Sequence, residues 1–277
     1  MNHTPPLWRR ALLGGAALLP LAGCSPLELV NALTPARGVT AEVGLPYGPL
    51  PRQRFDLYRP PGLADGAPLL VFIHGGGWRT GGREEYAFIA RPLARLGCLV
   101  AVPNYRIWPE ARFPDFVEDT ALAVRALSQC ERGRRLVLMG HSAGAFNAAC
   151  VALDSRWGQR ERVGGFIGLA GPYAFGADEV DPPEIFADMP HIRAAPEPLD
   201  ARTTPPLLLL HGEADRVVGP YHSRILAKRA AEAGVPARHV TYPGMGHIGV
   251  LAALAAPVRA LHLAGGDVLG EVRAFLG

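Results

Sequence analysis

The sequence lacks a large excess of charge of either sign and lacks any recognisable metal-binding pattern. Its net charge is only +3 over 277 residues, and two of the positive charges, Arg9 and Arg10, lie in an N-terminal segment that contains no acidic residue. A nucleic-acid partner is not expected, because binding a phosphate backbone needs a strongly basic surface. A catalytic metal is not expected either, because the nine histidines show no HExxH or similar ligand spacing.

Cysteine is scarce, with four residues and no CxxC pair. Cys24 lies near the N-terminal segment, which leaves the odd set Cys98, Cys130 and Cys150, so nothing in the sequence requires a disulfide. Cys98 begins an apolar strand pattern, and Cys150 lies among the small residues of a helical pattern. In such places cysteine usually behaves as a buried apolar side chain.

The N-terminus has the three-part layout of a secretory signal peptide. The arginine pair is followed by an apolar stretch over residues 11–22 and then by small residues. Roughly 12 apolar residues are too few for a mature transmembrane helix, which needs about 20. An ordinary secretion signal and an uncleaved anchor helix are both compatible with this layout, and the paired arginines allow a twin-arginine export route.

Residues 21–24, Leu-Ala-Gly-Cys, resemble the lipobox of bacterial lipoproteins. The resemblance implies that residues 1–23 are a lipoprotein signal peptide and that Cys24 becomes the lipidated first residue. It further implies export and a lipid anchor in a bacterial membrane, with the protein facing the periplasm. Ser25 replaces the aspartate associated with inner-membrane retention in that family, which favours the outer membrane.

The rest of the chain predicts one α/β domain over residues 51–277. Residues 24–50 are rich in Pro, Gly and Ala and are expected to form a tether or N-terminal arm. Beyond them, continuous apolar runs alternate with helical patterns, which is typical of a mostly parallel sheet with helices on both faces. The predicted strands are 53–59, 69–73, 98–102, 136–139, 163–170, 207–210 and 239–242, and the predicted helices are 84–96, 113–127, 142–153, 221–233 and 250–276.

The only long irregular stretch is the proline-rich segment 171–206. Loops of this length in a compact domain are usually functional or carry a small cap. This segment follows a strand end, where ligands bind in open α/β sheets. We therefore expect a short cap there, with Trp78, Trp108 and His141 as further candidate residues of the substrate pocket.

Residues 140–144 read Gly-His-Ser-Ala-Gly and match the G-x-S-x-G pattern of a nucleophile elbow. The pattern lies between an apolar strand and a helix that is small and apolar on all sides, as such an elbow requires. The glycines allow the strand and helix backbones to approach closely around a strained serine. With five serines and 33 glycines in the chain, chance predicts only about 0.07 such matches. Ser142 is the candidate nucleophile.

A serine hydroxyl needs a general base and a third group that orients the base. Asp215 follows the predicted strand 207–210, and His247 follows the last predicted strand, so both are expected at the same edge of the sheet. The chain order Ser, Asp, His is typical of α/β-hydrolases. Glu213 competes with Asp215 for the acidic role.

Residues 74–78, His-Gly-Gly-Gly-Trp, follow the apolar run 69–73 and match an oxyanion loop of the HGGG type. Such a loop presents backbone amides to the negative charge that develops on a substrate oxygen. We expect the donors to be Gly76 and Gly77, together with the amide of Ala143.

One further glycine motif and three polar side chains are expected to have structural rather than catalytic or binding roles. Residues 244–249 satisfy G-x-G-x-x-G, but only about 28 residues follow, too few for the further strands of a dinucleotide-binding unit. His74 and His211 end predicted strands and are expected to hold neighbouring loops by hydrogen bonds. Asp119 is expected to be structural, on a helix face.

Taken together, these motifs resemble the esterase branch of the α/β-hydrolases that includes hormone-sensitive-lipase-like, feruloyl esterase-like and kynurenine formamidase-like enzymes. The resemblance implies an eight-stranded sheet, the catalytic triad, the oxyanion loop and no cofactor, and it implies that Tyr105 and Arg106 brace the oxyanion loop. The segment before Leu207 is too short for a large cap, which argues against a long-chain lipid pocket. The matching landmarks are HGGGW at 74–78, NYR at 104–106, PEARFPDFVED at 109–119, GHSAG at 140–144, HGEADRVV at 211–218 and PGMGH at 243–247.

The sequence thus predicts a serine hydrolase that cleaves carboxylic esters of small acyl or aryl substrates through an acyl-enzyme. An arylformamidase is the alternative within the same machinery. A non-catalytic lipoprotein that uses the fold as a binding module is the alternative of another class, although it would not require an intact triad.

Overall fold

A computed structural model describes residues 26–277 except for residues 37, 188, 190 and 196. Cys24 and the predicted signal peptide lie outside the described residues. Within the described part of the chain, no helix combines the length and hydropathy needed to cross a membrane.

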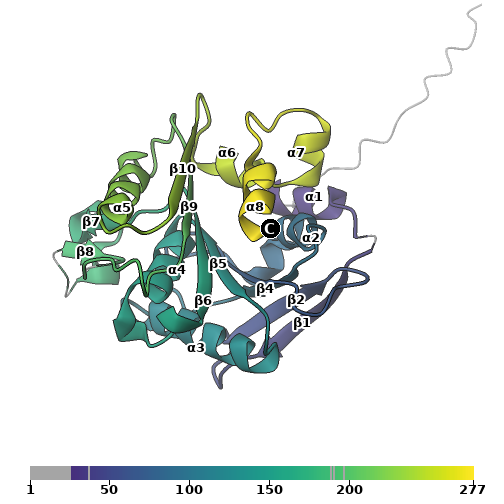
Figure 1. Cartoon of the computed structure of the whole chain (residues 1–277), viewed down its shortest axis with the longest axis horizontal. Helices are drawn as coiled ribbons and strands as arrows, with labels where there is room; N and C mark the ends of the chain where they lie inside the picture. The colour runs from purple at the N-terminus through teal and green to yellow at the C-terminus, as the bar shows by residue number, and fades with distance from the viewer. Residues whose placement is uncertain (1–25, 37, 188, 190, 196) are drawn as a thin grey trace, which may run out of the picture.

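An eight-stranded sheet forms the centre of the fold (Figure 1). Its order is β1-β2-β4-β3-β5-β6-β9-β10. Pairing is antiparallel between β1 and β2 and between β2 and β4, and parallel at every other position. This mostly parallel sheet confirms the predicted fold class. The strands are β1 (Thr40–Pro46), β2 (Arg54–Arg59), β3 (Leu69–Ile73), β4 (Leu99–Pro103), β5 (Leu136–His141), β6 (Val163–Leu169), β9 (Leu207–Gly212) and β10 (Ala237–Tyr242).

Helices cover both faces of the sheet, and the strand side chains alternate between the two layers. Leu69, Val71 and Ile73 of β3 belong to the core cluster that includes side chains of α3, α4 and α5. Leu70 and Phe72 of the same strand belong to the cluster on the other face, which includes side chains of α2, α6 and α8. Because β3 is buried on both sides, its sequence is a continuous apolar run. The helices are α1 (Pro26–Leu33), α2 (Ala87–Ala94), α3 (Asp115–Cys130), α4 (Ala143–Leu153), α5 (Tyr221–Glu232), α6 (His247–Ala252), α7 (Ala256–Ala260) and α8 (Val268–Leu276).

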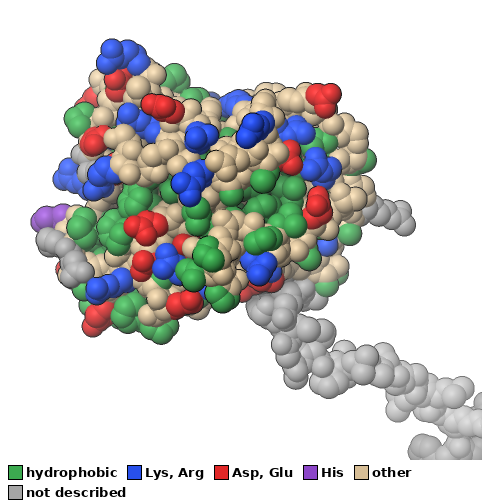
Figure 2. All heavy atoms as spheres, turned by 90° about the horizontal axis from the view of Figure 1, so that it is seen from below, with side chains coloured by type: hydrophobic (Ala, Val, Ile, Leu, Met, Phe, Trp, Pro, Cys, Tyr) green, Lys and Arg blue, Asp and Glu red, His purple; other side chains and the backbone are tan. Residues whose placement is uncertain are grey.

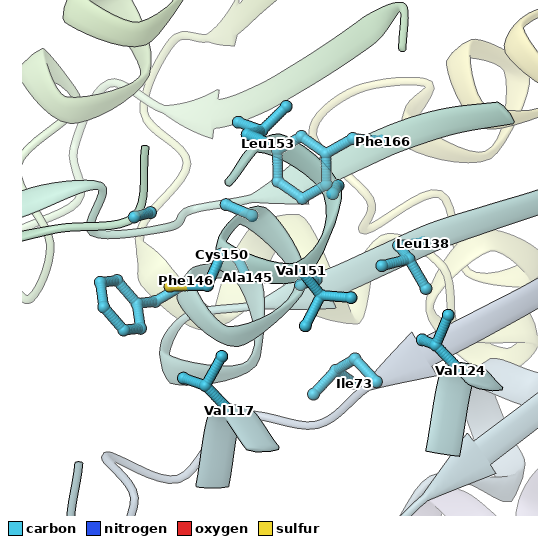
Figure 3. Close-up of a cluster of buried hydrophobic side chains, with 14 of the residues drawn as sticks. Ile73, Val117, Val124, Leu138, Ala145, Phe146, Cys150, Val151, Leu153 and Phe166 are labelled. Carbon is cyan, nitrogen blue, oxygen red and sulfur yellow. The ribbon is translucent and has the colours of Figure 1, made fainter. Parts of the chain in front are cut away.

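Helix α4 is buried along its whole length, as expected for a helix that is apolar on all sides. Its Phe146 and Val151 lie among side chains that come from neighbouring strands and from α3 (Figure 3). Ile73 and Phe166 reach the helix from the sheet, and Val117 reaches it from α3. The helix that follows Ser142 is therefore held rigidly by the core.

The structure differs from the sequence prediction at both ends of the domain. Residues 26–33 and 40–46, which we expected in a tether or arm, form α1 and the edge strand β1. Strand β1 is exposed along most of its length, so its sequence has no apolar run to reveal it. The predicted helix 250–276 is broken into three helices, because Pro257 lies in the first turn of a new helix and Gly265 and Gly266 interrupt the apolar periodicity.

The segment 171–206 forms a small cap. It contains an antiparallel pair of short strands, β7 (Ala174–Gly176) and β8 (His191–Arg193), joined by 3₁₀ turns. Its Phe175 and Phe186 pack on Trp78, with ring centroids 5.9 Å and 4.9 Å from that of the indole. The cap is thus anchored to the loop that follows β3.

On the face shown in Figure 2, acidic and basic side chains are interspersed among hydrophobic ones. Cys98 and Cys150 are buried free thiols, as their sequence surroundings predicted, and Cys130 is exposed. Among the described residues, no group of three or more His, Cys, Asp or Glu side chains is arranged to hold a metal ion.

Candidate active site

Ser142 occupies a sharp turn between β5 and α4. Its backbone has φ 55° and ψ −125°, a conformation that non-glycine residues rarely adopt. The amide of Ser142 donates to the carbonyl of Leu169 at 3.0 Å, which ties the turn to the neighbouring strand β6. The strain is maintained because the strand before Ser142 and the helix after it are both fully buried.

The two glycines of the elbow are required by space. A Cβ atom on Gly140 would lie 2.3 Å from the carbonyl oxygen of Gly144, and a Cβ atom on Gly144 would lie 2.2 Å from that of Ile73. Both clashes are with backbone, which cannot rotate away. The G-x-S-x-G spacing therefore follows from the close approach of β5, α4 and the end of β3.

Ser142, His247 and Asp215 come together at the carboxyl edge of the sheet, although they are distant in sequence. His247 Nε2 lies 2.9 Å from Ser142 Oγ, and His247 Nδ1 lies 2.8 Å from Asp215 Oδ2. His247 is the first residue of α6, and Asp215 lies in the turn after β9. These contacts are those of a nucleophile, a base and an orienting acid.

The carboxylate of Asp215 is held in its ionised form. Burial alone would raise its pKa, but hydrogen bonds from the amides of Val218 and Val217 and from His247 outweigh burial and lower the pKa below its usual value. Both amides donate to Oδ1 at 2.9 Å, which leaves Oδ2 for the imidazole. His211 Nε2 lies 3.2 Å from the same Oδ2 and 2.9 Å from the carbonyl of Val218, so it braces this turn as predicted.

Glu213, the competing acid, lies away from the site. Its carboxylate accepts a hydrogen bond from the hydroxyl of Thr241 at 2.8 Å, on the exposed side of the β9–β10 edge. The two acids are two residues apart, yet only Asp215 contacts His247.

The loop after β3 borders Ser142 closely. A Cβ atom on Gly75 would lie 3.3 Å from Ser142 Cβ. Gly76 has φ 121° and accepts hydrogen bonds from the amides of Arg79 and Thr80 at 3.0 Å, so its backbone forms a tight turn. Gly77 has φ 59° with open space around its Cβ position. Gly77 lines the two cavities that are also lined by Ser142.

The candidate oxyanion donors surround the same space. Gly77 and Ala143 line one cavity beside Ser142, and Gly76 and Gly77 line another. In the part of the chain that the structure describes, the amides of Gly76, Gly77 and Ala143 donate no backbone hydrogen bond in a turn, a loop or a helix cap. An arrangement of this kind can present amides to a substrate oxygen.

Tyr105 and the buried ring of His74 support the loop that follows β3. The hydroxyl of Tyr105 donates to the carbonyl of His74 at 3.0 Å, and the two rings stack with centroids 4.4 Å apart. Burial lowers the pKa of His74 to about 4, so the ring is neutral. Its Nδ1 lies 2.8 Å from the carbonyl of Gly75. The expectation that Tyr105 braces this loop agrees with these contacts.

Arg106 does not brace the loop as expected. Its Nε and Nη2 donate to the two carboxylate oxygens of Asp119, at 2.9 Å and 3.0 Å. Asp119 is buried on α3 and also accepts from Gln53 at 2.8 Å. Arg106 instead connects the segment that follows β4 to α3, because the buried carboxylate of Asp119 needs a charged partner.

Of the three candidate pocket residues, Trp78 and His141 face different cavities beside Ser142, and Trp108 lines neither of them. Trp78 lines a cavity of about 220 Å³, and its Nε1 donates to Asn147 Oδ1 at 3.0 Å. His141 lines a cavity of about 470 Å³, and its Nε2 lies 3.1 Å from the carbonyl of His247. The pKa of His141 is lowered to about 3, mainly by burial and secondarily by the neighbouring His247. The sequence offered no signal for Asn147, which looks there like an interruption in an apolar helix.

Comparison with known proteins agrees with this geometry. Residues 70–182 match a family profile described as an α/β hydrolase fold, and residues 171–260 match a profile of the prolyl oligopeptidase family. A probable isoprenylcysteine α-carbonyl methylesterase of Oryza sativa subsp. japonica is 28% identical over 238 residues, which cover 74% of this chain and 57% of the relative. Kynurenine formamidase of Danio rerio is 34% identical over 126 residues, which cover 45% and 43% of the two chains.

Among solved structures, a truncated carbohydrate esterase from gut microbiota superposes with a TM-score of 0.71 at 19% identity, over 88% of this chain and 98% of that one. The sheet and the site thus define a class, the α/β-hydrolase fold with a Ser-His-Asp arrangement at its carboxyl edge. This chain has that fold and is similar in sequence to esterases of the class. It spans about half the length of the curated relatives it matches.

Proposed function

We propose that the protein is a carboxylesterase-type serine hydrolase that cleaves esters with small acyl or aryl groups. The observation that carries the proposal is the continuous path from Ser142 Oγ to His247 Nε2 at 2.9 Å and from His247 Nδ1 to Asp215 Oδ2 at 2.8 Å. The sequence similarity to a probable methylesterase supports it. A purely binding function would not require these three side chains to align.

The geometry supports an acyl-enzyme mechanism. His247 Nε2 removes the proton from Ser142 Oγ as the oxygen bonds to the ester carbon, and the carbonyl oxygen becomes negative beside the amides of Gly76, Gly77 and Ala143. His247 then gives the proton to the alcohol oxygen as its bond to carbon breaks. A water molecule repeats the sequence to release the acid, with Asp215 ionised throughout.

The first test is hydrolysis of p-nitrophenyl acetate by the purified protein. We expect Ser142→Ala to lower kcat by at least about 10³-fold, because the nucleophile is removed. Ser128→Ala is the matched control, since Ser128 lies on the exposed side of α3 and donates only to Arg125. Equal rates for wild type and Ser142→Ala would reject the proposal.

An arylformamidase is the second candidate. The 34% identity to a kynurenine formamidase over 126 residues supports it, and a probable isoprenylcysteine α-carbonyl methylesterase is 38% identical over a stretch of 112 residues, so identity does not separate the two functions. Parallel kcat/KM values for N-formylkynurenine and for short esters separate the two functions. A higher value for the formamide would replace the ester proposal while leaving the same triad in use.

We also propose that the protein is exported and lipid-anchored through Cys24 on a bacterial membrane facing the periplasm. The support is the lipobox-like sequence at 21–24, which lies outside the described residues. Labelling cells with radioactive palmitate should mark the wild-type protein and the Cys130→Ala variant but not Cys24→Ala. Cys130 is a suitable control because it is the exposed thiol of the described region. Label retained by Cys24→Ala would refute the anchor.

A further inference from the structure

Two cavities of different size and chemistry meet at Ser142. The smaller, about 220 Å³, is lined by Trp78 and Phe175 and carries charged groups of the cap. The larger, about 470 Å³, extends between α2, α6 and α7. Gly77 and Val217 line both cavities. Only the larger cavity includes His247 among its lining residues.

Contact with His247 determines which part of an ester each cavity can hold. The imidazole must give its proton to the alcohol oxygen when the bond between that oxygen and the acyl carbon breaks. The alcohol group therefore lies on the His247 side of the scissile carbon, and the acyl group lies on the other side. We propose that the larger cavity selects an apolar alcohol and that the smaller cavity holds a short acyl group. This inference rests on the proposed esterase function and specifies its substrate class.

The chemistry of the two linings supports this assignment. The larger cavity is bounded mainly by apolar side chains, among them Phe88, Leu251 and Val258. The smaller cavity has an aromatic base, but Arg79, Glu179 and Asp181 lie at its edge, and Arg79 forms an ion pair with Asp181 at 3.2 Å. A long acyl chain would have to pass these charged groups, whereas an apolar alcohol would exchange water for hydrocarbon contacts.

Helix α1 contributes to the lining of the larger cavity, and Asn31 fixes the position of this helix. Val30 of α1 lines the cavity. The next residue, Asn31, donates from Nδ2 to the carbonyl of Glu85 and accepts at Oδ1 from the amide of Phe88, both at 2.7 Å. Glu85 and Phe88 themselves line the cavity. Asn31 is therefore a positioning residue that joins the N-terminal helix to the start of α2.

Acetate esters isolate the alcohol side of the reaction, because all of them form the same acetyl-enzyme. We expect kcat/KM to rise from ethyl acetate through butyl acetate to hexyl acetate, whose leaving groups are equally reactive, by up to about fourfold for each buried methylene. Ethyl octanoate should be a poorer substrate than ethyl acetate, because its chain exceeds the smaller cavity. The opposite order, with long acyl chains favoured and alcohol size without effect, would overturn the assignment.

A variant that fills the larger cavity gives an independent test. Ala252 lines it, so Ala252→Trp should lower kcat/KM for 2-naphthyl acetate at least about tenfold while changing that for ethyl acetate less than threefold. Ala260→Trp is the matched control, since Ala260 is exposed on α7 and outside the lining. Equal losses on both esters in Ala252→Trp would contradict the proposal.

Asn31→Ala tests whether the position of α1 affects the larger cavity. We expect the ratio of kcat/KM between 2-naphthyl acetate and ethyl acetate to fall at least about fivefold, an effect that general destabilisation would not produce. An unchanged ratio would refute the positioning role. If none of the esters is cleaved, the proposed function fails; if they are cleaved without discrimination by alcohol, only this inference fails.

Discussion

At the scale of single residues, Asp215 shows why spacing alone could not assign the acid. Both Glu213 and Asp215 follow the predicted strand 207–210, and Asp215 is preferred because it lies in the loop beyond the carboxyl end of that strand, with Glu213 as the competitor. In the structure, the amides of Val217 and Val218 bind one oxygen of Asp215 and leave the other for His247. Residue types do not reveal a turn whose own amides bind the carboxylate of Asp215. The sequence could therefore rank the two acids, but only the backbone geometry explains why Asp215 contacts His247.

Asp215→Asn should lower kcat by about 10⁴-fold with KM nearly unchanged, because an amide can donate to Nδ1 and stabilise the wrong imidazole tautomer. Steady-state kinetics on p-nitrophenyl acetate measure the loss. Glu213→Gln is the matched control and should retain wild-type kcat, since its side chain contacts Thr241. A larger loss in Glu213→Gln than in Asp215→Asn would exchange the roles of the two acids.

At the scale of elements, the buried strands and α4 were predictable and the peripheral elements were not. Strands such as β3 are apolar throughout because both faces are covered. Edge strand β1 is exposed along most of its length and has little buried surface to encode. Helix α1 is held by the two hydrogen bonds of Asn31, which no sequence pattern indicated. The apolar pattern of residues 250–276 correctly indicated helix, but the prediction of a single helix missed the breaks near Pro257 and Gly265.

The elbow gives the prediction at this scale. Gly144→Ala should destabilise the protein by about 3 kcal/mol, because the new Cβ would meet backbone oxygens of β3 and the following residue. The melting temperature should fall by roughly 10 °C. Gly62→Ala is the control: Gly62 has φ 62° but open space, so only the left-handed backbone strain of about 1–2 kcal/mol applies. A smaller loss in Gly144→Ala than in Gly62→Ala would contradict the proposed close approach.

At the scale of the whole molecule, the triad depends on loops from three separate strands meeting at one edge. The parallel sheet brings these ends together, so the candidate site could be predicted once the strands were recognised. Trp78, His141 and the cap were expected at the pocket, but its division into two cavities could not be predicted, because the walls also come from α1, α6 and α7, whose packing is encoded in no local pattern. The buried histidines next to the site are likewise a property of the assembled core.

Burial of neutral histidines should make the protein sensitive to acid. The pKa of His74 falls from 6.5 to about 4 in the folded state, so the unfolded chain binds a proton first as the pH drops through 6.5. His74 therefore does not lower the free energy of unfolding above about pH 6.5. Below that pH, the free energy of unfolding decreases toward pH 4, by about 2 kcal/mol at pH 5 from this residue alone.

Urea unfolding at pH 7.5 and pH 5 measures this decrease. His74→Asn should show a smaller difference in free energy of unfolding between the two pH values than wild type does. His191→Asn, at an exposed position of β8, should keep the wild-type difference. A larger pH difference in His74→Asn than in wild type would show that the sign of the linkage is wrong.

The central claim is that the hydroxyl of Ser142 is activated by His247. A fluorophosphonate reagent followed by peptide mapping measures this reactivity directly, because the reagent bonds covalently to an activated serine and to no ordinary one. We predict a stoichiometric adduct on the peptide containing Ser142, and its loss in His247→Ala although Ser142 is still present. An unlabelled wild-type protein, or an adduct confined to another serine, would contradict the account.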